Sequence, residues 1–390
     1  MTPPAASSNV PRQRRIVHFV HALNGRTLAV LAGVLAGEMR GRGHDVALLA
    51  VKGSLGAQPL PSGVSAEIVG EESTWRTSGA LPALRRSLQR HRPDVVFAHG
   101  NGPIRAAVVA TRGWRRRPVV VGIEHNHYSS YDWNLRPLRD VVNRLLLPRA
   151  DAVAGVSGGV VSDLEATFPP LRGRVALLPP PLTRYVDLGQ LAAEPVEHPW
   201  FRDEVPVVTA VGHVHPRKDH RTLVRAIARV LEVAGPDAAR LVIVGEATGP
   251  EADQVRALVT HLDLDDHVDL VGAQANPLRF VARSTVFALS SRNEGMPVSI
   301  LEAMAVGVPV VSTDCPSGPA WILENGTRGL LAPVGDGIAL GDALLTMLGD
   351  PDLRRRLASW GVQRAADFSP AAIAEQYLAV AVAGAAARDR

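Results

Sequence analysis

The sequence predicts an α/β protein made of two doubly wound domains joined by a proline-rich linker. Short runs rich in β-branched residues alternate with segments of helical pattern along most of the chain. The runs are continuously apolar, which is typical of strands buried on both faces of a parallel sheet. This rhythm breaks in the passage 177–200, which contains three consecutive prolines, and then starts again.

Five strands are expected in each half, with helices between them. In the first half they are IVHFV (16–20), DVALLAV (45–51), DVVFAH (94–99), PVVVGIEH (118–125) and ADAVAGVS (150–157). In the second half they are VPVVTAVG (205–212), ARLVIVG (239–245), HVDLVG (267–272), STVFALSS (284–291) and VPVVSTD (308–314). Repeated strand–helix–strand units give a parallel, doubly wound sheet in each half.

The domain boundaries follow from these elements. We expect a disordered tail over 1–14, a first domain over 15–185, a linker over 186–204, a second domain over 205–366, and a last segment over 367–390. Most of that last segment is an apolar helix (369–387), which is expected to pack back on the first domain.

Composition excludes several classes of protein. No run of about 18 apolar residues is present, and the first 15 residues lack the apolar stretch of a secretory signal. A single cysteine, Cys315, fits a reducing cytoplasm, where we expect the protein to be located. The basic runs are short and lack interleaved aromatic residues, so nucleic acid is not an expected partner.

The segment LPALRRSLQRHR (81–92) has the pattern of a basic amphipathic helix. Its basic side is either a solvated surface or a peripheral contact with the anionic inner face of a membrane. The sequence leaves both interpretations open.

Functional residues are expected directly after the strands, because ligands bind beyond the carboxyl ends of an open parallel sheet. In the first half these positions hold His21, Asn24, Gly25, His99, Glu124, His125 and Asn126. In the second half they hold the segments 212–218, 245–246, 272–276 and 290–294.

The segment 294–302 predicts an anion site. Pro297 suits the first turn of a helix that runs to about Val306, and Gly295 lets backbone approach a ligand closely. Free amides and the helix dipole then favour a negative ligand at the helix start. Glu302 lies inside this helix, where a carboxylate can hold the paired hydroxyls of a sugar; a solvated surface residue is the alternative.

Lysine is almost absent from this chain. Of the 42 Lys and Arg residues, only Lys52 and Lys218 are lysines. A lysine retained beside Arg217 indicates that an ammonium group is needed at position 218.

A resemblance to a known family rests on the stretch SSRNEGMPVSILEAMAVGVPVVSTDCPSGPAWILENGTRGLL (290–331). It contains a glutamate, seven residues and a second glutamate, followed by EAMA, a glycine and PVV. This resembles the signature of family 4 of the retaining GT-B glycosyltransferases. GHDV (43–46), VSGGVVSDL (156–164) and VGHVHPRKDHRTLVRAI (211–227) are similar to other landmarks of the family, so the resemblance covers nearly the whole chain. It implies the GT-B fold, with two Rossmann-like domains facing a central cleft.

The resemblance also implies a donor site. In the family the first glutamate contacts the hydroxyls of the donor sugar, the second contacts the ribose, and the amides between them hold the diphosphate. A lysine neutralises the leaving diphosphate, and the chain has His213 where the family usually has arginine. The donor-binding residues expected on this basis are Gly212, His213, Arg217, Lys218, Gly272, Asn276, Glu294, Gly295, Met296, Pro297, Val298 and Glu302.

An acceptor site is implied in the first half. His125 is similar to a histidine that lies beside the anomeric carbon of the donor in relatives, and it completes the expected catalytic set with Lys218 and Glu294. A buried structural histidine is the alternative. The acceptor-binding residues expected are Asn24, Gly25, His99, His125, Asn126, His127 and Tyr128, and Asp132 stands in the same region.

The implied reaction moves a hexose or N-acetylhexosamine from a nucleotide diphosphate sugar, UDP-linked, to an acceptor hydroxyl with retention of configuration. The acceptor is a glycan, a lipid-linked molecule or a natural product. No cofactor and no metal are expected, and the acidic run DLDD (263–266) is interpreted as a surface turn. Two alternatives remain, namely an isomerase similar to a nucleotide-sugar 2-epimerase and an inactive nucleotide-sugar-binding subunit.

Overall fold

The computed structural model describes residues 13–24, 27–56, 60–70, 77–130, 136–183 and 187–389. By its contacts the chain divides into two compact units. The first unit comprises Met1–Ile123, Val141–Val153 and Tyr377–Arg390, and the second comprises Glu124–Asp140 and Ala154–Gln376. Each unit is described by itself. The predicted tail and the predicted linker lie partly outside the described residues, and the predicted domain boundaries stay a prediction.

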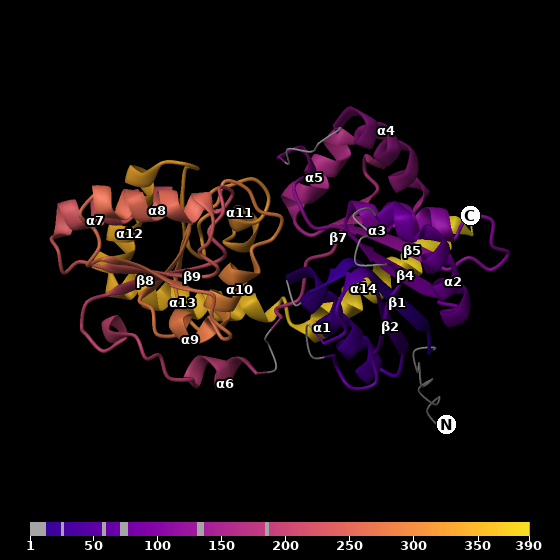
Figure 1. Cartoon of the computed structure of the whole chain (residues 1–390), viewed down its shortest axis with the longest axis horizontal. Helices are drawn as coiled ribbons and strands as arrows, with labels where there is room; N and C mark the ends of the chain where they lie inside the picture. The colour runs from indigo at the N-terminus through magenta and orange to yellow at the C-terminus, as the bar shows by residue number, and fades with distance from the viewer. Residues whose placement is uncertain are drawn as a thin grey trace, which may run out of the picture. The chain divides into compact units, whose positions relative to one another are not determined.

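A seven-stranded sheet forms in the first half of the chain, in the order β3-β2-β1-β4-β5-β6-β7 (Figure 1). Its strands are β1 (Arg15–Leu23), β2 (Asp45–Gly53), β3 (Ser65–Ile68), β4 (Val95–His99), β5 (Val119–Glu124), β6 (Ala152–Gly155) and β7 (Val175–Leu177). The strand pairs from β3 to β5 are parallel. The helices that precede the linker are α1 (Thr27–Gly41), α2 (Leu81–His91), α3 (Asn101–Ala110), α4 (Arg136–Leu146) and α5 (Gly158–Thr167).

A six-stranded, fully parallel sheet forms in the second half, in the order β10-β9-β8-β11-β12-β13. Its strands are β8 (Val207–Val211), β9 (Arg240–Val244), β10 (Val268–Gly272), β11 (Val286–Leu289), β12 (Val310–Thr313) and β13 (Leu330–Ala332). Its helices are α6 (Leu188–Ala193), α7 (His220–Ala234), α8 (Pro250–His261), α9 (Leu278–Val281), α10 (Val298–Ala305), α11 (Pro319–Ile322), α12 (Gly337–Gly349) and α13 (Pro351–Ala366).

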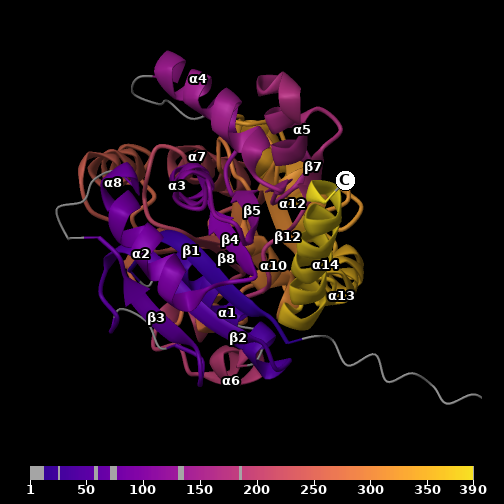
Figure 2. The ribbon, with the colours of Figure 1, turned by 90° about the vertical axis from the view of Figure 1, so that its right-hand side faces the viewer.

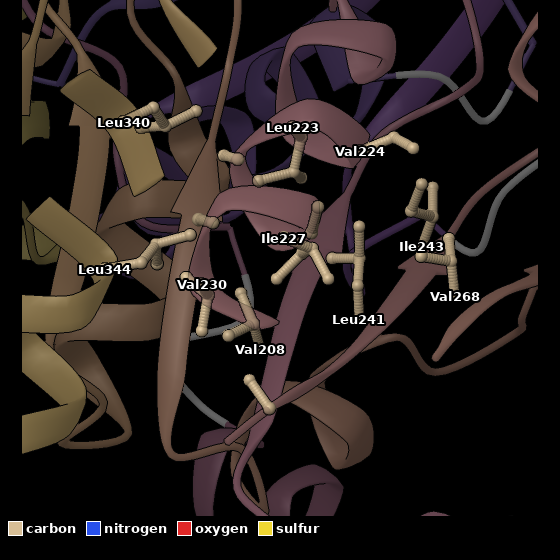
Figure 3. Packing of buried hydrophobic residues seen from close by; sticks show 14 of the residues in the cluster. Val208, Leu223, Val224, Ile227, Val230, Leu241, Ile243, Val268, Leu340 and Leu344 are labelled. Atoms are coloured by element: carbon tan, nitrogen blue, oxygen red, sulfur yellow. The ribbon is translucent and has the colours of Figure 1, made fainter. Parts of the chain in front are cut away.

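The core of the six-stranded sheet follows from the alternation of side chains along each strand. Val208 on β8 packs in the cluster that α7, α8 and α12 cover, where Ile227 and Leu344 meet the sheet (Figure 3). The neighbouring Val207 points to the opposite face and packs with Phe280 of α9. Both faces of the strand are therefore buried, which is why the sequence shows continuous apolar runs.

Three strands were absent from the sequence prediction, namely β3, β7 and β13. They contain only three or four residues, are mostly half-buried and lie at or next to the sheet edges, so they lack the apolar signal of a central strand. Both sheets share the strand order 3-2-1-4-5-6 from their own first strand. The strand order therefore reverses between β1 and β4 in one sheet, and between β8 and β11 in the other.

Helix α14 (Pro370–Arg388) is long and apolar enough, by length and composition, to cross a membrane. The same features occur in core helices, and Ile373, Ala374 and Ala381 are buried here. From Tyr377 onward the helix belongs to the first unit. The Tyr377 ring lies 5.4 Å from the ring of Phe97 and 6.4 Å from that of His99, measured between centroids.

Candidate functional site

A buried carboxylate, Glu294, lies in the loop that follows β11. Its Oε1 atom is 2.6 Å from Lys218 Nζ and accepts a hydrogen bond of 2.8 Å from Ser291 Oγ. Its Oε2 atom is 4.0 Å from Arg217 Nη1. The loops after β8 and β11 thus meet where the winding of the sheet reverses, which is the position at which such folds bind ligands.

The charge state of Glu294 follows from these neighbours. Burial is the largest single influence and by itself raises the pKa of Glu294. The charges of Lys218 and Arg217, together with the hydrogen bonds from Lys218 and Ser291, outweigh it and lower the pKa below the usual value of 4.5. Glu294 is therefore ionised at neutral pH, and with two cations beside it the cluster keeps a net positive charge.

The loop after β8 holds Lys218 in place through its backbone. The Lys218 amide donates to the His215 carbonyl at 2.8 Å, which closes a turn. The Lys218 carbonyl accepts a hydrogen bond of 2.9 Å from Ser290 Oγ, so the loops after β8 and β11 are joined directly. Asp219 adds a second connection, because its carboxylate lies 3.0 Å from Arg292 Nε.

Gly295 allows a very close backbone approach. A Cβ atom at this position would lie 1.7 Å from the carbonyl oxygen of His125. No side chain fits there, so glycine is required for the segment after Glu294 to reach the His125 backbone in the second unit.

Helix α10 starts directly behind this contact, with Pro297 as its N-cap and Val298 as its first residue. The helix begins one residue later and ends one residue earlier than predicted. The first amides of a helix have no intrahelical acceptor and carry the positive end of the dipole. Together with Lys218 and Arg217 this helix start can bind a doubly charged anion such as a diphosphate.

Glu302 is the fifth residue of α10 and is half-buried. Its Oε1 atom accepts a hydrogen bond of 3.1 Å from Thr183 Oγ1. The residue before Thr183 is fixed by the backbone, since the Leu182 amide donates to the Phe368 carbonyl at 2.8 Å. A residue 119 positions away in the chain therefore orients this carboxylate.

The remaining predicted donor residues occupy the surrounding loops. Gly212 follows β8, and a Cβ atom there would lie 3.1 Å from Lys218 Cε. His213 is exposed, and its ring lies 5.2 Å from the ring of His215. Gly272 ends β10 with a φ of +73°, which favours glycine.

Asn276 is bound to the protein at both ends of its side-chain amide. Nδ2 donates to the Leu191 carbonyl at 2.8 Å, and Oδ1 accepts from the Leu278 amide at 3.1 Å. These bonds hold the loop before α9, and a contact of Asn276 with the donor stays a prediction.

The segment after β5 is organised by the buried carboxylate of Glu124. Its Oε1 atom accepts hydrogen bonds from the amides of His125 at 3.0 Å and Asn126 at 3.1 Å. Burial lowers the pKa of His125 to about 3, so its imidazole is neutral at pH 7. A neutral imidazole can donate one hydrogen bond and accept another, which suits a contact with a sugar hydroxyl.

The next two residues of this segment have different surroundings. His127 is half-buried, and its Nδ1 atom is 2.7 Å from Ser130 Oγ and 3.8 Å from a carboxylate oxygen of Asp163. Tyr128 is fully buried and donates its hydroxyl hydrogen to Asp140. The geometry gives Tyr128 a structural role in the loop, while His127 stays a candidate for acceptor binding.

Two of the predicted acceptor residues of the first unit, His99 and Asn24, lie in the part of the chain that the structure describes. His99 is buried, and its Nε2 atom is 3.1 Å from Nδ1 of His18 on β1. This geometry makes His99 part of the core. Asn24 follows β1 and is exposed. Gly25 and Asp132 lie outside the described residues.

Sequence reasoning placed Ser290 and Ser291 at the end of a strand and inside the family motif, but gave neither of them a role. Thr183 gave no signal, because only folding brings it to Glu302.

The acidic run 263–266 lies in a turn between α8 and β10, as predicted, with its three aspartates exposed and Leu264 buried. Within the described ranges, no three His, Cys, Asp or Glu side chains are grouped as a metal site requires. That the reaction needs no metal stays a prediction.

Comparison with known proteins identifies the class. A profile described as "Glycosyl transferases group 1" matches residues 205–350, and one described as "Glycosyltransferase Family 4" matches residues 28–183. Together with the two parallel sheets, these matches define the protein as a GT-B glycosyltransferase by fold. The chain belongs to glycosyltransferase family 4.

Two relatives and one solved structure illustrate the similarity. The lipopolysaccharide core biosynthesis glycosyltransferase LpsE of Rhizobium meliloti is 35% identical over 176 residues, which cover 45% of this chain and 49% of LpsE. An N-acetylgalactosaminyltransferase of Campylobacter jejuni, named for a diphospho-undecaprenol substrate, is 30% identical over 234 residues, 60% of each chain. The Anabaena protein HepE, solved with UDP and glucose, has a TM-score of 0.75 at 17% identity and covers 94% of this chain and 98% of its own.

These matches have a limited extent. The alignments span 57%, 49% and 60% of three curated relatives, about half to three fifths of their length. The solved structure, at its low identity, shows the fold alone.

Proposed function

We propose that this protein is a retaining glycosyltransferase that transfers a hexose or N-acetylhexosamine from a UDP-sugar to an acceptor hydroxyl. The observation that carries the proposal is the buried Glu294, paired with Lys218 beside the start of α10. The cluster offers a carboxylate for sugar hydroxyls and, next to it, cations and helix amides for a diphosphate. A nucleotide diphosphate sugar has these two parts directly bonded to each other.

In the proposed reaction the bond between the anomeric carbon and the diphosphate oxygen breaks. Lys218, Arg217 and the amides of 295–298 stabilise the negative charge that develops on the leaving diphosphate. The acceptor oxygen bonds to the anomeric carbon on the same face, and its proton passes to the leaving phosphate. The products are the glycosylated acceptor and the nucleoside diphosphate, with the configuration retained.

The other residues would bind and orient the substrates. Glu294 would hold the sugar hydroxyls and Glu302 those of the ribose, while the neutral His125 would contact the sugar without adding charge. We propose that no metal is needed, because protein cations and amides supply the positive charge. HepE, which shares the fold, was solved with UDP and glucose, so UDP is the first nucleotide to test.

The acceptor is proposed only as a class. LpsE is named for lipopolysaccharide core biosynthesis, and the Campylobacter jejuni relative is named for an undecaprenol-linked glycan. These names support a glycan on a lipid carrier over a small natural product. Such an acceptor would place the enzyme at the inner face of a membrane.

Calorimetric titration with UDP, GDP and ADP tests the donor site. We expect one nucleotide, UDP, to bind with and without EDTA, and Glu302→Ala to weaken its binding by about 1–3 kcal/mol, the value of a hydrogen bond to a charged group. Glu324→Ala is the matched control. Glu324 is half-exposed and forms an ion pair with Arg328. If no nucleotide binds, or if Glu302→Ala binds as well as the wild type, the proposal fails.

A second measurement separates the reaction types. Incubation with the bound UDP-sugar, followed by NMR, shows whether a new sugar isomer appears without an acceptor. Isomer formation would establish the epimerase alternative, and binding without turnover for any acceptor would favour the inactive subunit.

A further inference from the structure

Helix α4 is turned the opposite way from an ordinary surface helix. Amphipathic helices of globular proteins direct their apolar side to the core. In α4 the inward side is polar, because Asn143 is buried and accepts a hydrogen bond of 2.7 Å from Arg105 on α3. Asp140 likewise faces inward and accepts the hydroxyl hydrogen of Tyr128.

The outer side of α4 is apolar. Leu138, Val141 and Leu145 are exposed by 62%, 56% and 53%, and their spacing places them on one side of the helix. We call these three residues the α4 strip. Figure 2 shows α4 as one continuous helix. An exposed apolar strip of this kind is typical of a contact with another protein or with a membrane.

The charges around the strip define that partner. Arg144 and Arg149 are exposed, and Arg149 donates a hydrogen bond to the backbone carbonyl of Leu145 in the strip. The only carboxylate between 138 and 149 is Asp140, which is directed inward to Tyr128. Over the described residues 138–149 the outer surface therefore combines apolar side chains with cations and presents no acid.

We propose that the α4 strip inserts between the headgroups of an anionic lipid bilayer, with Arg144 and Arg149 against the lipid phosphates. Transfer of exposed leucine and valine side chains from water to the boundary between headgroups and acyl chains lowers the free energy. The arginines beside them are attracted by the negative surface potential of the bilayer. A second copy of this chain fits less well. Two strips face to face would bring four arginines together, and the one carboxylate of each segment 138–149, Asp140, is directed inward to Tyr128.

Helix α2, the segment in which the sequence left a membrane contact open, is a weaker candidate. Its residues Leu84 and Leu88 are buried and Leu81 is half-buried, so it has no row of exposed leucine or valine side chains like that of α4. Two of its basic side chains, Arg90 and His91, contact Glu67. Charge alone remains on its outer side, around a hollow lined by Arg86, Gln89, Arg90 and Arg92.

Insertion can be observed with a dye placed on the strip. The chain has one cysteine, Cys315, which is buried, and burial raises the pKa of its thiol to about 12, so it reacts slowly with labelling reagents. Val141→Cys carrying an environment-sensitive fluorophore is expected to shift its emission to the blue with vesicles of equal parts phosphatidylcholine and phosphatidylglycerol. Ile338→Cys, at a position 65% exposed on α12, is the matched control and should not respond.

Vesicle flotation then tests whether the strip drives binding. The triple variant Leu138→Ser, Val141→Ser and Leu145→Ser should bind the anionic vesicles at least about tenfold more weakly. Arg144→Ser and Arg149→Ser should each cost roughly fivefold. The control triple Val233→Ser, Val334→Ser and Ile338→Ser removes three exposed apolar residues elsewhere and should bind like the wild type. Unchanged melting temperatures verify folding, because all six positions are on the surface.

The proposal is overturned by any of three results. The wild type could fail to float with anionic vesicles, or float equally well with phosphatidylcholine alone. The two triple variants could lose binding equally. The strip variant could convert a dimer into a monomer, which would identify a second copy as the occupant. None of these results depends on nucleotide binding, so the test is independent of the proposed donor site.

Discussion

The two sheets share the strand order 3-2-1-4-5-6, to which the first sheet adds a seventh strand, but they use their polar residues differently. Beside β8 and β11, Lys218 and Glu294 meet in a charged cluster in the loops before α10. In the seven-stranded sheet, His18 and His99 pair with each other in the core, at 3.1 Å. The comparison teaches that a shared topology provides a place for a site, and that side-chain direction decides whether a site is built there.

The largest effect expected from this difference is at Lys218. Lys218→Met removes the ammonium that would stabilise the leaving diphosphate, and we expect turnover to fall about 10²–10³-fold. The readout is release of UDP from the UDP-sugar. Lys52→Met, which removes the other lysine of the chain, is the control and should change turnover little. A loss at Lys218 smaller than about tenfold would contradict its catalytic role.

The buried His18 of the first unit should make the stability of the protein sensitive to acid. Burial lowers the pKa of His18 from 6.5 to about 3. The folded protein keeps His18 neutral down to that pH, whereas the unfolded chain takes up a proton below pH 6.5. Stability from this residue is therefore complete above pH 6.5 and is lost as the pH falls toward 3.

Between pH 7 and pH 5 the loss from His18 is about 2 kcal/mol. The free energy of unfolding can be measured by chemical denaturation at both pH values. Its decrease from pH 7 to pH 5 should be smaller in His18→Leu than in the wild type, by about 2 kcal/mol. His261→Leu, which changes an exposed histidine at the end of α8, should behave like the wild type. Equal losses in all three proteins would show that His18 is not a buried neutral group.

A smaller effect is expected at Thr183, which orients Glu302. Thr183→Val removes a hydrogen bond to a carboxylate and should weaken UDP binding by about 1 kcal/mol, roughly fivefold. Binding of 2′-deoxy-UDP should change less, because the affected carboxylate is proposed to contact ribose hydroxyls. Thr183→Ser keeps the hydroxyl and should restore the preference for UDP. If Thr183→Val weakened both nucleotides equally, the residue would have a general structural role.

The smallest effect is expected at His213, where the family usually has arginine. His213→Arg would add a cation beside the loop that holds Lys218 and should strengthen UDP binding about threefold at low salt. His261→Arg adds the same charge at a distant exposed position and serves as the control. An equal gain in both variants would indicate a general charge effect and no specific contact with the diphosphate.

Much of the architecture was determined by the sequence itself. Continuous apolar runs predicted the central strands of both sheets, because burial on both faces excludes polar residues from them. The motif from Glu294 to Glu302 predicted an anion-binding helix start, and α10 begins within one residue of the expected position. Local rules suffice for such features, since helix starts and buried strands depend on neighbours in the chain.

Tertiary structure alone decided how these groups pair. Glu294 is joined to Lys218 across 76 positions and Glu302 to Thr183 across 119, and no local pattern encodes such contacts. The direction of His99 into the core, and of Leu138, Val141 and Leu145 out of it, was decided in the same way. A side chain at the end of a strand or on a helix can face a ligand, the core or a membrane. The direction it takes depends on which distant segments of the chain pack against that strand or helix.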